Sequence, residues 1–403
     1  MISSGDGMHS SRNASTTVIR EINRKQVLSC IRQSGPMPRV DIVNRTGLSK
    51  PTVTRVIEQL ISEGLLVETG IISTSRGRHP INVDINASAR YVIGVNLSKN
   101  TMGVALVNFG MHIVEKRLTS IKEISSTKEL LAAISDMISE LLESNKVDKS
   151  KVLGVGIGVP GLVDCAKGIV KDFALSGKLR DIPLARYLED QFHFPVLIDN
   201  NCNTRMLGEY YFGYAVGCKN AMFILNSEGV GCGLVMDGKL YNKLNNTTSG
   251  FGHLCVNVDG PKCRCGGYGC VEAYCSTEEI EKKAYERLCA KNKGDADNSI
   301  AIPSYRYVCN SIAQGDMTFV SILVEAAQAM ASGLVSMINL FNPETIILSG
   351  NMFDASDFYY NKVIEELGIR MGNANALPRI VRRRVQDALY EIGAATIILQ
   401  KVF

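Results

Sequence analysis

Four residues of one short segment have side-chain types and a spacing that suit a zinc ion. The segment GHLCVNVDGPKCRCGGYGCVE offers one imidazole and three thiols, which belong to His253, Cys263, Cys265 and Cys270. Structural zinc takes four nitrogen or sulfur ligands in a tetrahedron, and glycines let so short a loop fold back on itself. Unpaired buried cysteines are the simpler interpretation, but they do not explain three thiols within eight residues of a Gly-rich loop. The sequence therefore predicts a structural Zn²⁺ held by these four side chains.

The same segment resembles the signature of the ROK family, the bacterial repressors and sugar kinases that share one fold. The family pattern is Gly-His, a spacer, and then C-x-C-G-x-x-G-C-x-E, and all of it is present here. The resemblance implies that the His and the three Cys hold a structural zinc. It also implies that His253 and Glu272 line a sugar site. Because the family contains both enzymes and DNA-binding proteins, the rest of the chain must distinguish between them.

Composition is that of a protein with ordinary folded domains. The chain has 403 residues, enough for two or three domains, and its 45% apolar content can build sizeable cores. No run of 18 or more apolar residues occurs, so no membrane span is predicted. Residues 1–15 lack the pattern of a secretory signal and are predicted to be a flexible tail, with Met8 as an alternative start. The twelve cysteines then favour a reducing bacterial cytoplasm and metal ligation over disulfides.

Positive charge is concentrated near the N-terminus. Residues 1–88 carry 11 Lys and Arg against 7 Asp and Glu, a net charge of +4. The whole chain also has a net charge of +4, so residues 89–403 sum to zero. A basic N-terminal fifth is expected when one module contacts phosphates.

The basic region has the pattern of a mainly α winged helix-turn-helix, predicted over residues 16–88. Helices are predicted over Thr16–Ser34, Arg39–Thr46 and Lys50–Glu63, followed by strands at residues 64–68 and Ile81–Ile85. The apolar residues of the first helix are predicted to form one buried face: Val18, Ile22, Val27 and Ile31. In the third helix the predicted buried residues are Val53, Ile57 and Leu60.

The start of the third helix carries the candidate DNA contacts, because the N-terminal residues of a recognition helix reach base edges. Ser49 can cap this helix, and Pro51 suits its first turn. The candidate DNA-binding residues are Ser49, Lys50, Thr52, Thr54 and Arg55, with Arg76 and Arg78 in a basic wing. A three-helix protein-interaction module is the alternative. DNA binding is favoured because these polar side chains gather on the reading helix, and the segment resembles the DNA-reading domain of ROK repressors.

The pattern of residues 89–403 predicts a duplicated α/β unit. Strand meanders begin at Tyr91–Asn96 and again at Ala221–Leu225, and each is followed by helices. By resemblance this is the two-lobed, actin-like (ribonuclease H-like) ROK domain. Lobe one is expected at about 89–200 plus the C-terminal helix, and lobe two at about 201–385. Ligands are expected in the cleft between the lobes, whose closure is a natural switch.

Three elements that a ROK kinase needs for phosphoryl transfer are altered in this chain. The kinase pattern D-x-G-G-T reads NLSKN here, G-T-G-x-G-x-G reads SEGVGCG, and N-D-A-N reads NNCN. The altered positions include Asn96, Ser98, Lys99, Glu228 and Asn201. An amide at the position of the catalytic base cannot accept a proton, and Glu228 places negative charge where phosphates would lie. The sequence predicts that the protein is not an enzyme.

The residues expected to bind the sugar match the family pattern better than the phosphoryl-transfer motifs do. The candidate effector-binding residues are Gly161, Asn200, Asn201, His253 and Glu272. Gly250 stands where the family has a Glu that grips the sugar. This departure leaves open a different or bulkier ligand, or none.

Together these features predict a zinc-containing transcription regulator, with repression favoured over activation. It would bind a palindromic double-stranded DNA operator as a homodimer or homotetramer and respond to a sugar or sugar derivative from carbohydrate metabolism. Two alternatives stay open: an active ROK carbohydrate kinase with a regulatory DNA module, and a regulator controlled by a partner protein. ATP turnover with a hexose would favour the first, and capture of a protein from lysate the second.

Overall fold

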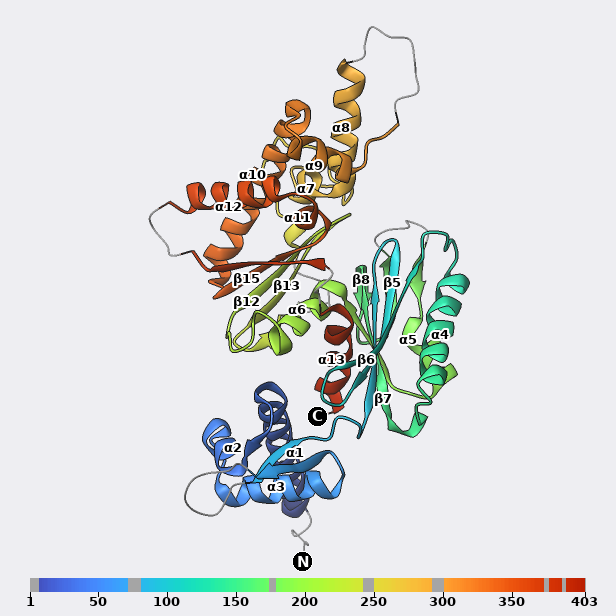
Figure 1. Cartoon of the computed structure of the whole chain (residues 1–403), viewed down its shortest axis with the longest axis vertical. Coiled ribbons are helices and arrows are strands. Elements are labelled where there is room, and N and C mark those ends of the chain that lie inside the picture. The colour runs from blue at the N-terminus through green and yellow to red at the C-terminus, as the bar shows by residue number, and fades with distance from the viewer. Residues whose placement is uncertain are drawn as a thin grey trace, which may run out of the picture.

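The chain folds into an N-terminal module and two lobes (Figure 1). The computed structural model describes residues 7–71, 81–173, 179–241, 250–291, 301–372, 377–385 and 389–402. The N-terminal module lies at one end of the molecule. Each lobe is built on its own five-stranded sheet. This is the winged helix followed by a two-lobed α/β domain that the sequence predicted.

The module is a winged helix. Its helices are α1 (Gly7–Ser34), α2 (Arg39–Thr46) and α3 (Lys50–Ser62). Its strands are β1 (Met37–Pro38), β2 (Leu66–Ile71) and β3 (Ile81–Ile85), paired antiparallel in the order β1-β3-β2. Gly47 ends α2 in the left-handed conformation (φ 68°), and the Ser49 side chain accepts a hydrogen bond from Thr52 N to start α3. The helix-turn-helix is therefore built by local signals in the sequence.

Helix α1 differs from the prediction in two respects. It begins at Gly7, so residues 7–15 of the predicted tail belong to a helix. Val27 and Ile31 are buried as predicted, but Val18 is 58% and Ile22 55% exposed. The reason is helical geometry: Ile22 and Ile31 are nine residues apart, about two and a half turns, and so lie on opposite sides of the helix. The buried face continues instead through Arg24, whose guanidinium donates two hydrogen bonds of 2.7 Å to the carboxylate of Glu63, the C-cap residue of α3.

The first lobe has a mixed sheet in the order β11-β7-β4-β5-β6. Its strands are β4 (Tyr91–Leu97), β5 (Thr101–Asn108), β6 (Ile113–Ser120), β7 (Val152–Val159) and β11 (Val196–Asn200). Helices α4 (Thr127–Ser144) and α5 (Leu184–Phe192) and the short η1 (Lys149–Lys151) accompany it. A small antiparallel sheet, which the sequence did not predict, contains β8 (Gly161–Asp164), β9 (Ile169–Phe173) and β10 (Arg180–Ile182).

The second lobe repeats this plan with the sheet order β14-β13-β12-β15-β16. Its strands are β12 (Ala221–Asn226), β13 (Val230–Met236), β14 (Lys239–Leu240), β15 (Thr345–Ser349) and β16 (Arg379–Arg383). Its longer helices are α6 (Asn201–Phe212), α8 (Thr277–Lys291), α9 (Tyr305–Ala313), α10 (Val320–Phe341) and α12 (Asp357–Met371). Shorter turns are α7 (Glu272–Cys275), α11 (Asn351–Ala355), η2 (Phe251–His253) and η3 (Met317–Phe319).

Helix α10 with its preceding turn has a length and composition that could cross a membrane, and among the described residues it alone does. More than half of its most apolar stretch is buried inside the lobe, where residues such as Ala326 and Met330 belong to the core cluster. A buried apolar helix is the expected centre of such a lobe.

The last helix, α13 (Tyr390–Val402), returns to the first lobe and lies directly on its sheet (Figure 1). A Cβ on Gly94 of β4 would lie 1.9 Å from Glu391 O, and one on Gly156 of β7 would lie 1.9 Å from Ala394 O. On its other side, a Cβ on Gly393 would lie 2.0 Å from Thr204 O of α6. Only glycine allows backbones to approach this closely, so these residues fix the position of α13.

The same helix joins the lobes to the module through one continuous apolar cluster. Leu28 and Ile31 of α1 share this cluster with Val92 of β4, Val107 of β5 and Ile398 of α13. The module is therefore packed on the first lobe by buried side chains as well as connected to it by the chain.

Replacing Gly156 by valine is expected to displace α13, because the new side chain would overlap the carbonyl of Ala394. Overpacking of this kind costs about 1–3 kcal/mol or more. Urea denaturation followed by circular dichroism should therefore show a lower free energy of unfolding.

The matched control is Gly368→Ala in α12, where an added Cβ would meet no atom within 4 Å. Alanine inside a helix is expected to stabilise it by about 0.5–1 kcal/mol relative to glycine. Unchanged stability of Gly156→Val would contradict the close packing of α13.

Candidate functional site

The four predicted metal ligands meet at one point of the second lobe. The ligand atoms of His253, Cys263, Cys265 and Cys270 all lie within 4.8 Å of one another. Cys263 Sγ is 3.8 Å from His253 Nδ1, and Cys265 Sγ is 3.8 Å from Cys270 Sγ. Sulfurs placed ~2.3 Å from a tetrahedral zinc are about 3.8 Å apart. These four side chains, called the metal cluster below, therefore fit a metal ion of zinc size.

Backbone turns hold the metal cluster in place. Isolated antiparallel bridges join Cys255 to Cys270 and Lys262 to Tyr268. The loop closes where Cys263 N donates to Gly267 O at 2.8 Å. Gly269 has φ +64°, and a Cβ there would lie 1.6 Å from Asn257 O. The glycines noted in the sequence are thus needed for the turn and the close packing of the loop.

The predicted effector residues line a single cleft of about 1050 Å³ between the two lobes. All five lie on its wall: Gly161, Asn200, Asn201, His253 and Glu272. Asn96, Ser98, Lys99 and Glu228, the altered kinase positions, line it too. Gly250 is also on the wall and has open space around it, since an added Cβ would meet no atom within 4 Å. The cleft is of the size that holds small molecules.

Glu272 is a largely enclosed acidic group of this wall, at 5% exposure. Its Oε2 accepts a hydrogen bond from Val230 N at 2.9 Å, and its Oε1 accepts one from Arg264 Nε at 2.7 Å. In the sequence Arg264 lies between two cysteines of the metal cluster, so this contact ties their loop directly to the cleft wall. Hydrogen bonding to a fixed partner orients a carboxylate for a ligand.

The two asparagines have different surroundings. Asn200 Oδ1 accepts from Cys202 N at 2.8 Å, and Asn200 Nδ2 donates to Gly161 O at 2.9 Å. Its amide therefore caps α6 and holds the loop at Gly161. Within the described ranges, the Asn201 side chain has only a long contact, from Cys202 Sγ to its Oδ1 at 3.6 Å. Of the two amides, that of Asn201 is the freer to bind a ligand.

Behind them lies a buried carboxyl group that the sequence analysis did not single out. Asp199 Oδ1 accepts from Asn200 N at 2.6 Å and from Asn203 Nδ2 at 2.9 Å. Burial raises the pKa of Asp199 above its ordinary value, although these two hydrogen bonds oppose the rise. Burial, with Asp199 close by, also raises the pKa of the Cys165 thiol to about 12. Cys165 therefore stays protonated at neutral pH and donates to Asp199.

Two arginines of the cleft were missed by sequence reasoning. Arg205 of α6 is buried and reaches Asn96 Oδ1 and Ser98 Oγ, each at 3.4 Å. Arg264 holds Glu272 as described. Arg205 belongs to no motif quoted from the sequence, and Arg264 is the unspecified residue of the C-x-C pattern between two predicted metal ligands. Its closeness to Glu272 follows from the folded loop.

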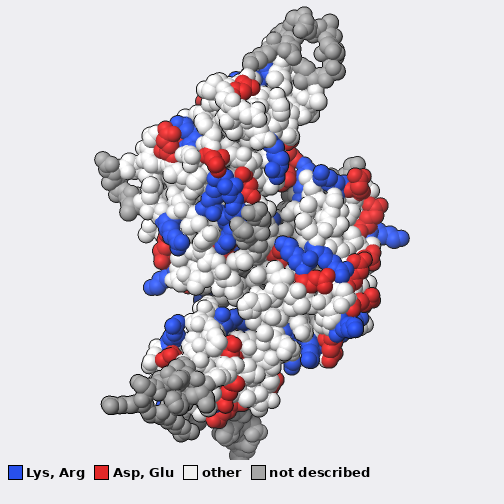
Figure 2. Space-filling model, viewed as in Figure 1, with Lys and Arg blue, Asp and Glu red and all other residues white. Residues whose placement is uncertain are grey.

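Cations dominate the cleft wall, with six against three acidic groups. The cations are Lys99, Lys116, Lys122, Arg205, Arg264 and Arg306. The acids are Glu228, Glu272 and Glu391. Lys99, from the first lobe, forms an ion pair with Glu278 of α8 in the second lobe. Basic side chains also gather near the junction of the lobes in Figure 2.

The start of α3 presents the candidate DNA contacts at the surface. Ser49, Lys50 and Arg55 are exposed, while Thr52 and Thr54 are partly buried. Ser49 Oγ bonds to Thr52 Oγ1 at 2.8 Å, so both hydroxyls also serve the helix cap. The predicted buried residues are at 0% exposure: Val53, Ile57 and Leu60. Arg76 and Arg78 of the predicted wing lie outside the described residues.

The fold and the cleft define a two-lobed sugar-kinase-like domain with a winged-helix module in front of it. The chain belongs to the ROK family, whose model matches residues 92–401. The MarR family model matches residues 22–68, within the module.

Several named proteins are similar to this chain. A xylose repressor of Bacillus spizizenii is 29% identical over 89% of each chain. The transcriptional dual regulator NagC of Escherichia coli K12 is 23% identical over 84% of this chain and 82% of its own.

Solved structures share the fold. A ROK family transcriptional regulator, described as a homolog of the E. coli MLC protein, has a TM-score of 0.78 at 24% identity and covers 94% of this chain and 96% of its own. A ROK glucokinase of Streptomyces griseus, in complex with glucose and AMPPNP, has a TM-score of 0.65 at 25% identity. It covers 77% of this chain and 99% of its own. The regulator covers far more of this chain than the kinase does.

Proposed function

We propose that this protein is a cytoplasmic transcription regulator that represses genes of carbohydrate uptake or catabolism. The module binds a palindromic operator, and a sugar or sugar derivative in the interlobe cleft changes operator affinity. The observation that carries the proposal is the shared apolar cluster of α1, β4, β5 and α13. Because it packs the module on the lobe that forms half of the cleft, movement of the lobes is transmitted to the DNA-reading helix.

The likeness to repressors supports the sign of the regulation. Similar proteins over most of the chain are named xylose repressor and N-acetylglucosamine repressor. A two-fold dimer would present two copies of α3 about one DNA turn apart, as a palindromic operator requires. A homotetramer would contain the same pair.

The cleft is better suited to binding than to phosphoryl transfer. A kinase needs a base for the sugar hydroxyl and metal ligands for the nucleotide. By resemblance, Asn201 stands at the position of the catalytic base. Asn96 stands at the Asp of the kinase pattern D-x-G-G-T, and its amide contacts the Arg205 guanidinium. A fixed cation at that place would compete with a magnesium ion. We therefore propose that the protein has no kinase activity.

The metal cluster is proposed to hold Zn²⁺ with a structural role. His253 and the three cysteines would be its ligands, and zinc would supply cross-linking of the loop. Through the contact between Arg264 and Glu272, the loop would also fix the effector wall.

The proposal is tested by selecting genomic fragments with the purified protein at physiological salt and sequencing them. Enrichment of a palindrome beside carbohydrate genes is expected, and a panel of sugars should then release the DNA. Only salt-sensitive, sequence-independent binding would refute specific reading. Operator affinity unchanged by every sugar would refute the sugar switch and favour control by a partner protein.

Replacing Glu272 by glutamine is expected to weaken sugar-dependent release at least tenfold, with unchanged operator affinity in the absence of sugar. The reason is that a hydrogen bond to a charged group contributes about 1.5–3 kcal/mol, while the amide oxygen can still accept from Val230 N. Release is measured by fluorescence anisotropy of labelled operator. Glu279→Gln on α8, whose partner is Lys282, is the control. If both variants released the operator equally at the same sugar concentration, Glu272 would not be a residue of the effector site.

A further inference from the structure

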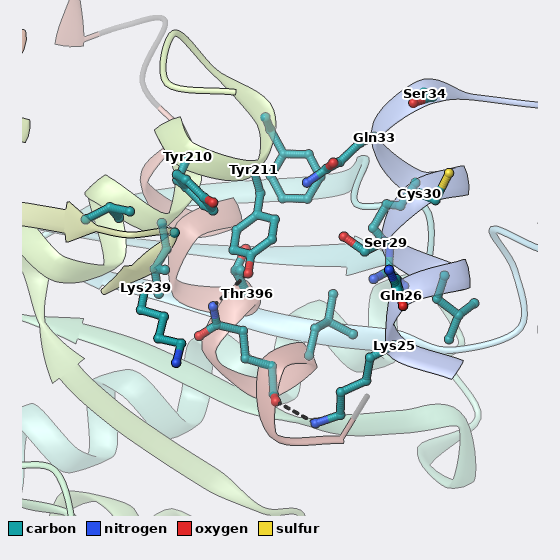
Figure 3. A pocket seen from close by; sticks show the side chains of 18 of the residues that line it. Lys25, Gln26, Ser29, Cys30, Gln33, Ser34, Tyr210, Tyr211, Lys239 and Thr396 are labelled. Carbon is teal, nitrogen blue, oxygen red and sulfur yellow. Dashed lines mark hydrogen bonds between the residues drawn. The ribbon is translucent and has the colours of Figure 1, made fainter. Parts of the chain in front are cut away.

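A second cavity of about 1070 Å³ lies between the module and the two lobes (Figure 3). One wall is formed by α1 and the end of α2, and the other by α6, β14 and α13. None of its lining residues lines the interlobe cleft. It is therefore a separate site. It lies between the module and the lobes, whose contact the proposed regulation depends on.

The lining of this cavity is cationic. It contains Lys25, Arg32, Arg45 and Lys239 and, among the described residues, no Asp or Glu. Lys25 Nζ donates to the backbone oxygen of Gln400 at 3.3 Å, and Arg45 Nη1 donates to Ser34 Oγ at 2.7 Å. Both acceptors are neutral, so the positive charge of the wall is left without a counter-charge in the described part of the chain.

Arg32 is the most unusual of the four. Its Nε and Nη2 are enclosed and have no hydrogen-bond partner in the part of the chain that the structure describes. Its guanidinium lies over the Phe109 ring, 4.8 Å from the centroid. Burial lowers the pKa of Arg32 to about 10. An enclosed cation without an acceptor is unfavourable, and an anion in the cavity would remove that penalty.

The rest of the lining suits a polar molecule. Gln26, Ser29 and Gln33 follow one another at helical spacing along the face of α1 that looks across the cavity (Figure 3). On the opposite wall the Tyr211 hydroxyl accepts from Gln400 Nε2 at 3.1 Å, and Tyr210 stands beside it at a ring distance of 5.1 Å. Amides, hydroxyls and aromatic rings are the groups that bind a hydroxylated carbon skeleton.

We propose that this cavity binds a phosphate group, carried by a small phosphate monoester or present as inorganic phosphate. A phosphate offers several acceptor oxygens and up to two negative charges, which matches a wall with several cationic donors better than a single carboxylate does. Since α1 belongs to the module and α6 and α13 to the lobes, the ligand joins the two parts. It is a second input to the module, distinct from the sugar cleft.

The test is isothermal titration calorimetry on the full-length protein without DNA, at fixed ionic strength in chloride. The probes are inorganic phosphate, glycerol 3-phosphate, ribose 5-phosphate and glucose 6-phosphate, with glycerol, ribose and glucose as unphosphorylated partners. At least one phosphate compound is expected to bind saturably. Tighter binding of an ester than of inorganic phosphate assigns the site to the ester, and equal binding assigns it to the free ion.

Arg32→Gln is expected to weaken this binding at least tenfold. Lys239→Gln, at the end of β14, is the second variant and decides the matter if Arg32→Gln does not fold. Lys122→Gln, which changes a cation of the interlobe cleft, is the control and should bind as the unaltered protein does. The proposal is overturned if none of the four phosphate compounds binds, or if the deciding variant binds with unchanged affinity. Because no DNA is present, this result is independent of the proposed repressor function.

Discussion

A protein with Cys263→Ser and Cys265→Ser is expected to lose its metal and much of the stability of the second lobe. Binding of structural zinc releases about 10–16 kcal/mol in small zinc domains, so losing two of four ligands should cost more than an ordinary substitution, about 0.5–3 kcal/mol. The expected result is less than stoichiometric zinc by elemental analysis and a melting temperature lower by many degrees. The response to sugar should fail as well, because Arg264 between these cysteines holds Glu272.

Cys255→Ser is the matched control for this experiment. Cys255 is exposed, lies in the same loop and does not belong to the metal cluster. It should keep both the metal content and the melting temperature. If the double variant also kept both, the assignment of a zinc site would be wrong.

Replacing Lys50 and Arg55 together by alanine is expected to abolish specific operator binding. Both side chains are exposed at the start of α3, and neither has an ion-pair partner among the described residues. A well-placed contact to a base edge contributes about 1–3 kcal/mol to discrimination, so the two losses together correspond to about 30-fold or more. Anisotropy titrations with operator and with scrambled DNA would show the two affinities converge.

Arg186→Ala is the control for the reading helix, since Arg186 is an exposed residue of α5 in the first lobe. Its operator affinity should equal that of the unaltered protein. If the double variant still preferred operator over scrambled DNA, the base-specific contacts would have to lie outside α3. If only the salt dependence changed, these residues would contact phosphates and not bases.

The parts of the fold that local signals encode could be predicted from the sequence. The turn between α2 and α3 was predicted because Gly47, Ser49 and Pro51 act over a few residues. The metal cluster was predicted for the same reason, since its four residues lie in one short loop. The α1 face was predicted correctly at Val27 and Ile31 but not at Val18 and Ile22. Ile22 and Ile31 are not separated by whole helical turns.

The cleft was less accessible to sequence reasoning. Its residues come from distant segments, and only the family resemblance brought Gly161, Asn201 and Glu272 together. The contacts of Arg205 and Arg264 depend on where long, flexible side chains point after folding, which no spacing encodes. The cavity beside Arg32 arises from the packing of the module on the lobes, so no motif or spacing in the sequence indicates it.

The position of α13 has a consequence for how the protein is made. A ribosome synthesises the module well before α13. Until residues 390–402 emerge, the face of β4 and β7 that carries Gly94 and Gly156 is uncovered. The apolar cluster on which the module packs is then also incomplete. A truncated product lacking this helix would carry a DNA-reading helix with no control domain properly attached, and its exposed apolar surface would mark it for degradation. Helix α13 thus makes attachment of the module depend on the folding of a segment that lies far from it in the sequence.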